Sequence, residues 1–169
     1  MKDNRFVIGE HVVPLVAPIN SAGTAYATPY VDMKNALHAT FFLYLGVITA
    51  TSADQNIIVT MECSTAAASN ATETACSFNY RLSGVTGTDT WGAVTAATST
   101  GVSLDTTTAD GKMLMVDVDL VSFANQQGQY DARYVRMVVG IDAGGTVTNN
   151  AVWAVLDPAN VQLSPQSAS

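Results

Sequence analysis

Two segments of this chain place an apolar side chain at every second position, and this period constrains the fold more than any other feature. Residues 56–63 place apolar side chains at every odd position, and residues 76–82 place them at every even position. A period of two is typical of a β-strand that buries one face. We expect the segments to form one antiparallel hairpin, because a single register gathers all the apolar side chains on one face. That register pairs Cys63 with Cys76, Met61 with Phe78, Val59 with Tyr80 and Ile57 with Leu82.

Other segments carry the same kind of signal. Residues 113–120 place Leu and Val on one face and two aspartates on the other, as a half-buried strand does. Residues 40–49 are apolar or β-branched at both parities, which favours a central strand covered on both faces. Gly, Asp and Pro separate these segments, and no convincing helical period occurs. We therefore predict an all-β fold, an antiparallel β-sandwich or jelly roll of roughly eight or nine strands.

The chain length allows one domain with its own core, since 169 residues bury enough surface without further cross-links. The first part contains three of the five prolines and has no helical period, which favours an extended N-terminal arm over residues 1–29. We expect the sandwich domain over residues 30–160 and a polar C-terminal tail over residues 161–169.

The charge balance argues against several functions. A net charge of −7 with only seven Lys and Arg residues argues against binding nucleic acid, because phosphate recognition needs clustered basic side chains. The longest apolar run, residues 41–48, is too short to cross a membrane. The N-terminal sequence lacks the apolar core of a signal peptide, so we expect synthesis in a cytoplasm.

The two cysteines permit one pair. The predicted hairpin places Cys63 opposite Cys76, within the separation that a disulfide spans. A reducing cytoplasm disfavours the bond, so two reduced thiols in the core are the alternative.

Candidate catalytic residues are few. The only histidines are His11 and His38, and neither accompanies a nucleophile motif. Asp117 and Asp119 would lie about 7 Å apart on one strand face and could share a Ca²⁺ ion. No third ligand is visible near them, and two acids on a solvated sheet face are the simpler interpretation. We therefore expect no enzymatic activity, no resident metal and no cofactor.

Aromatic residues offer one further possibility. Trp91 and Trp153, together with some of the six tyrosines, could form a platform that binds sugars. Ordinary packing in a core or an interface is the alternative.

The order of the segments supports a family resemblance that covers about residues 28–157. It rests on residues 30–35, 41–48, 58–66, 78–81 and 134–139. In these segments the chain resembles the small capsid decoration, or cement, proteins encoded among the head genes of tailed bacteriophages. The resemblance implies a jelly-roll type fold and a homotrimer on the exterior of the virion capsid. It further implies that the partner is the major capsid protein, whose neighbouring subunits the trimer clamps.

The residues themselves are compatible with that role. Packaged DNA repels an acidic chain, and scarce charge suits broad contact surfaces. An extended arm can add a strand to the sheet of a neighbour. We expect capsid contact from the apolar residues of the arm, which are Phe6, Val7, Ile8, Val12, Val13, Leu15 and Val16. The alternative is that these residues form the first strand of the domain's own sheet.

Binding only to the mature shell would stabilise it by mass action, by about 4 kcal/mol per site at 1,000 times the dissociation constant. Other functions remain open at this point. A phage tail or receptor-binding module would use Trp91, Trp153 and residues 84–111 to bind glycans. A scaffold or shell-forming protein would assemble with itself.

Overall fold

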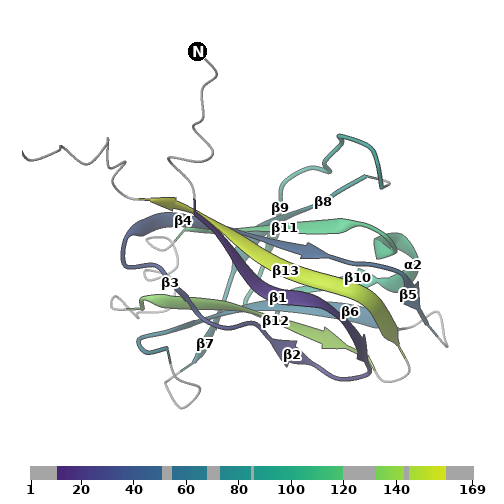
Figure 1. Ribbon diagram of the computed structural model, residues 1–169, viewed down its shortest axis with the longest axis horizontal. Helices are drawn as coiled ribbons and strands as arrows, with labels where there is room; N and C mark the ends of the chain where they lie inside the picture. The colour runs from purple at the N-terminus through teal and green to yellow at the C-terminus, as the bar shows by residue number, and fades with distance from the viewer. Residues whose placement is uncertain are drawn as a thin grey trace, which may run out of the picture.

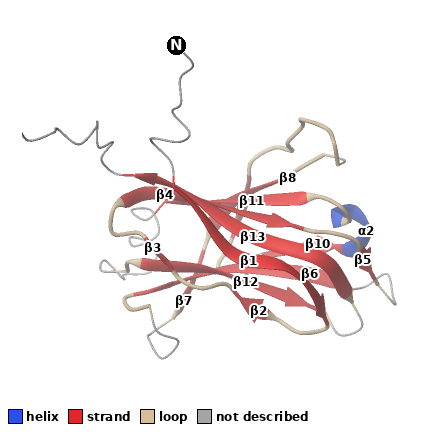
Figure 2. Cartoon of the chain, in the orientation of Figure 1, coloured by secondary structure: helices blue, strands red, loops and turns tan. Residues whose placement is uncertain are grey.

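The computed structural model describes residues 11–50, 55–67, 73–84, 86–119, 132–142 and 145–158. Nearly all regular structure there is strand, and a single four-residue helix, α2 (Thr106–Ala109), lies at one end (Figure 2). The prediction of an all-β fold is confirmed. The strands are β1 (His11–Ala22), β2 (Tyr26–Ala27), β3 (Val31–Asp32), β4 (Ala36–Tyr44), β5 (Ile48–Thr49), β6 (Asn56–Ser64), β7 (Thr74–Cys76), β8 (Phe78–Leu82), β9 (Thr95–Ala97), β10 (Val102–Asp105), β11 (Met113–Asp119), β12 (Tyr134–Ile141) and β13 (Thr146–Pro158).

The strands form two antiparallel sheets that pack face to face, as Figure 1 shows. The seven-stranded sheet has the order β1-β13-β4-β11-β8-β9, and β5 also pairs with β13. The six-stranded sheet has the order β10-β6-β12-β2, and it also includes β3, paired with β12, and β7, paired with β6. The predicted sandwich is therefore present.

The strand pairs are nested within one another along the chain. The outermost pair is β1 with β13, and inside it β2 and β3 pair with β12. Further inside, β4 pairs with β11, and β6 pairs with β10. Successive pairs alternate between the two sheets. This nesting is that of a jelly roll in which β2 and β3 share one strand position.

The core lies between the sheets and takes alternate residues from each strand. Phe41 and Leu43 of β4 and Leu114 of β11 point inward from one sheet, while Met61 of β6 and Met137 of β12 point inward from the other. All five are fully buried. Burying a large apolar side chain contributes about 1.5–3 kcal/mol, so this shared layer holds the two sheets together.

The predicted single hairpin is wrong. In β6 and β7, Met61 lies opposite Cys76 and Cys63 lies opposite Thr74. The chain then crosses to the other sheet, where β8 pairs with β11 and β9. Met61 and Phe78 are both buried, at 0% and 6% exposure, but from opposite sheets. An alternating pattern shows which side chains of a strand face the core. It does not show whether two such strands pair within one sheet or face each other across the core from different sheets.

The predicted extended arm is also incorrect for the part that the structure describes. Strand β1 pairs with β13 along its length, and Leu15 and Val16 pack against the core. The second interpretation, a first strand of the domain's own sheet, therefore holds from His11 onward. Residues 1–10, with Phe6, Val7 and Ile8, and residues 159–169, with the predicted tail, lie outside the described residues.

Candidate binding face

The outward side of the seven-stranded sheet carries two rows of mostly apolar side chains. Residues directly opposite each other in paired strands point to the same side of a sheet. Because Ala39, Phe41 and Leu43 of β4 are buried, Thr40, Phe42, Tyr44 and their partners point away from the core. The first row is Pro14, Trp153, Phe42, Met115 and Arg81. The second row is Ala151, Tyr44, Met113, Ser83 and Trp91. We call these two rows the outer face; β1, β13, β4 and β11, which carry most of it, run side by side in Figure 1.

The centre of the outer face is aromatic. The rings of Phe42 and Trp153 stack with their centroids 5.6 Å apart and their planes 12° apart. Both side chains are only partly buried, as are Tyr44, Met113 and Met115. At the β1 edge, Val12 is 49% exposed and lies opposite Val155. The solvated side of an antiparallel sheet is normally polar, and a continuous apolar patch there is typical of an interaction surface.

The predicted carboxylate pair lies beside this patch, on the same side of the sheet. Asp117 lies opposite Thr40, and its Oδ1 accepts a hydrogen bond of 2.9 Å from the Thr40 hydroxyl. Asp119 lies opposite His38, which also pairs with Asp157 on β13. Within the described ranges, no group of three or more His, Cys, Asp or Glu residues is placed to hold a metal ion. His11 lies apart from His38, at the start of β1 opposite Leu156.

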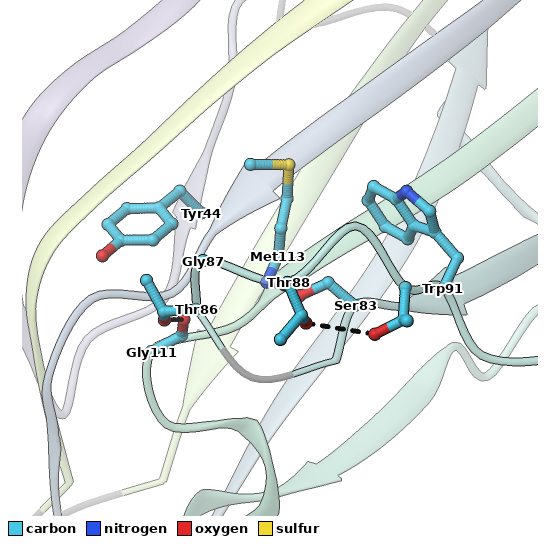
Figure 3. A pocket seen from close by; sticks show the side chains of 9 residues that line it. Tyr44, Ser83, Thr86, Gly87, Thr88, Trp91, Gly111 and Met113 are labelled. Carbon is cyan, nitrogen blue, oxygen red and sulfur yellow. Dashed lines mark hydrogen bonds between the residues drawn. The ribbon is translucent and has the colours of Figure 1, made fainter.

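The second row ends in a hollow of about 170 Å³, drawn in Figure 3. Tyr44 and Trp91 stand at its two sides with Met113 between them, and Trp91 is 37% exposed. Hydroxyl groups line the remaining wall, where the Oγ1 atoms of Thr88 and Thr90 are 3.0 Å apart. Of the two tryptophans that could form a sugar-binding platform, Trp91 lines the hollow, whereas Trp153 stacks on Phe42 and does not line it.

The outward side of the six-stranded sheet differs, because its charges are paired. Arg136 lies 2.8 Å from both Glu62 and Glu73, and its guanidinium is 4.7 Å from the ring centre of Tyr30. The Tyr30 hydroxyl donates to Glu73 at 2.8 Å. Burial, and then this hydrogen bond to a carboxylate, raise the pKa of Tyr30 to about 12. This cluster is a self-contained polar network, whereas the outer face is mostly apolar and partly exposed.

Both cysteines are free and buried, which matches the alternative of two reduced thiols. They do not lie opposite each other, because Cys63 pairs with Thr74 and Cys76 with Met61. The Cys76 thiol donates to the Met61 carbonyl at 2.9 Å. Burial raises the pKa of Cys63 to about 11 and that of Cys76 further, so both thiols stay protonated and unreactive at neutral pH.

Across the described ranges, no helix has the length and apolar character to cross a membrane. The predicted contact residues Val13, Leu15 and Val16 are partly buried in the sandwich, so Val12 is the most exposed member of that set within β1.

No protein-family model matches this sequence, and no curated protein does. A chain from a solved structure titled "Structure of infectious bursal disease virus Gx strain" aligns with 88% of this chain at 10% identity. The alignment spans 40% of that chain, and the TM-score is 0.23. A match at this identity and TM-score carries no argument about function, which we therefore argue from the residues of the outer face.

Proposed function

We propose that this protein is a structural virion protein of a tailed bacteriophage, without catalytic activity. In this proposal it binds the outer surface of the capsid and stabilises the shell by bridging major-capsid subunits. The observation that carries the proposal is the outer face, where Phe42, Trp153 and Met115 form an apolar row on a side of the sheet that is normally polar. The resemblance of the segments to decoration proteins supplies the identity of the partner.

The geometry changes which residues we expect to touch the capsid. Strand β1 is committed to its own sheet, and its pairing with β13 is interrupted by register shifts. Prolines and bulges at a sheet edge hinder the addition of a further strand. We therefore move the proposed contact from the arm to the outer face, to which β1 contributes only Pro14 and the neighbouring Val12.

The proposed mechanism is adhesive. Aromatic and Met side chains are enriched in the centres of protein interfaces, and their burial against the shell supplies the binding free energy. A protein that binds the assembled lattice and not its dissociated subunits raises the free energy of rupture at every occupied site. A homotrimer over a three-fold point would connect several subunits at once. The net charge of −7 favours the exterior of a shell filled with DNA.

The test is co-sedimentation of the purified protein with empty mature shells of the major capsid protein that the same phage encodes. A Phe42→Ser/Trp153→Ser variant should bind at least about tenfold more weakly, because aromatic residues at the centre of an interface carry much of its affinity. Ile58→Ser is the matched control, since Ile58 is 40% exposed on β6, in the six-stranded sheet. Equal binding by the double variant and the wild type would refute the proposal.

A second candidate function rests on the hollow. Tyr44 and Trp91 flank a small space whose other wall carries Thr hydroxyls, and aromatic faces with adjacent hydroxyls suit a sugar ring. A tail or receptor-binding module would use this site to bind glycans. Binding of the isolated protein to a glycan array, lost in Trp91→Ala, would favour this function over capsid decoration.

A further inference from the structure

Among the arginines that the structure describes, Arg81 alone forms no ion pair. Arg133 forms an ion pair with Asp32, and Arg136 forms ion pairs with Glu62 and Glu73. The Arg81 side chain makes no ion pair and no hydrogen bond with any residue that the structure describes, and its Nε is buried without a partner. A guanidinium that is partly removed from water without an acceptor is unfavourable. Nε is the buried atom and the side chain as a whole is only partly buried, so the remaining guanidinium nitrogens are the donors that a partner's acceptor can reach.

Arg81 lies at one end of the first row of the outer face. It lies on β8 opposite Met115, and its side chain is partly buried. The nearest carboxylate by register is Asp117, which lies opposite Asn79 and accepts a hydrogen bond from Thr40. The guanidinium thus ends a row of apolar side chains that is open to a partner.

We propose that Arg81 anchors the outer face to a carboxylate of the partner, an Asp or Glu side chain that is flanked by apolar residues. This inference rests on the proposed function, since it concerns the same face. The planar guanidinium presents its donors as a fork that matches a carboxylate in two hydrogen bonds. Apolar neighbours such as Met115 exclude water around the pair and strengthen its attraction.

The chemistry of the face favours a protein carboxylate over a polyanion. Binding to nucleic acid needs many phosphate contacts, whereas this face has one described cation and the whole chain carries a net charge of −7. One guanidinium at the end of an apolar row matches one acid within an apolar protein surface. The expected partner is therefore a protein, and under the proposed function it is the major capsid protein.

The experiment compares Arg81→Met and Arg81→Lys in the shell co-sedimentation assay at low and high salt. Arg81→Met keeps the length of the stem but removes the charge, and should weaken binding about tenfold or more and flatten its salt dependence. Arg81→Lys should recover only part of the affinity, because a point charge cannot make the bidentate contact. Lys34→Met is the charge-matched control; Lys34 is exposed in the turn before β4, and its loss should leave binding unchanged.

The outcomes separate this inference from the proposed function. If Arg81→Met binds like the wild type while Phe42→Ser/Trp153→Ser loses binding, the proposed role of Arg81 is wrong and binding through the outer face is supported. If all of these variants bind like the wild type, both are wrong. A change in the mass of the isolated protein on Arg81→Met, measured by analytical ultracentrifugation, would place the carboxylate on a second copy and overturn the assignment to the capsid. Lower thermal stability of Arg81→Met would indicate a structural role and overturn it as well, because an unpaired cation should not stabilise the fold.

Discussion

Asn150 is the polar group that ties β1, β13 and β2 together, and its removal is the sharpest test of the jelly-roll pairing. Its side chain is 1% exposed in β13. The Nδ2 atom donates to the Ser21 hydroxyl at 2.8 Å and to the Ile19 carbonyl at 3.0 Å, both in β1. The Oδ1 atom accepts from the Tyr26 hydroxyl at 2.7 Å, and Tyr26 belongs to β2 in the other sheet. One side chain thus connects both sheets.

The expected cost follows from these contacts. Asn150→Ala removes hydrogen bonds to β1 and β2. It leaves the buried Ser21 hydroxyl and the partly buried Ile19 carbonyl of β1 without this partner, and an unsatisfied buried group costs about 1–3 kcal/mol. Tyr26 is partly exposed and can turn its hydroxyl to water, so most of the cost comes from the lost hydrogen bonds to β1. We therefore expect the free energy of unfolding to fall by about 3 kcal/mol. Tyr26→Phe alone should cost about 1 kcal/mol.

Urea unfolding followed by circular dichroism measures these losses from the transition midpoint and slope. The double variant should lose less than the sum of the two single losses, because both remove the same hydrogen bond. Asn79→Ala is the control, since Asn79 is exposed on β8 and its loss should change stability by no more than about 0.5 kcal/mol. A loss below about 1 kcal/mol for Asn150→Ala, or strict additivity with Tyr26→Phe, would refute this account of the sheet connection.

Three further predictions concern other parts of the sandwich. Arg136→Met should lower the free energy of unfolding by about 2 kcal/mol, since it leaves Glu62 and Glu73 facing each other, and adding Glu73→Gln should restore part of the loss in the same urea assay. Hydrogen bonding to Arg133 lowers the pKa of Asp32, so its contribution is present above the unfolded pKa of about 3.9 and is lost as the pH falls through the lower folded value. Asp32→Asn should therefore be less stable than the wild type near neutral pH, with a difference that shrinks in acid; a difference independent of pH would exclude this ion pair as the cause. Gly46→Ala should lower the melting temperature, because a Cβ there would lie 1.8 Å from the Thr148 carbonyl oxygen, whereas Gly140→Ala, with its nearest atom at 3.5 Å, should be tolerated.

The sequence predicted the core better than it predicted the strand pairing. Alternation correctly placed Met61 and Phe78 in the core, because the side of a strand that faces the core is a local property. It could not show that their strands lie in different sheets, because the pairing depends on where the chain crosses between layers. The outer nested pairs, β1 with β13 and β2 and β3 with β12, join residues more than a hundred positions apart, and no local pattern specifies them.

The candidate site could be predicted only in part. Residue type and spacing make Trp91, Trp153 and Asp117 candidates, and all three lie on the outward side of the seven-stranded sheet. Phe42 and Tyr44 were missed because a segment that is apolar at both parities favours a strand covered on both faces. The structure covers one face of β4 with the core and leaves the other partly exposed. Apolar residues at both odd and even positions therefore predict that both faces of this strand are covered. We propose that the partner covers the outward face.

Hydroxyl-radical footprinting of the protein, free and bound to mature shells, tests the proposed binding face most directly, because oxidation reports the solvent access of individual Met and aromatic side chains. We predict that Met115, Trp153 and Phe42 become protected on binding, while Tyr134, on β12 of the six-stranded sheet, reacts as in the free protein. Protection of Tyr134 with unchanged oxidation of Met115 and Trp153 would contradict the account.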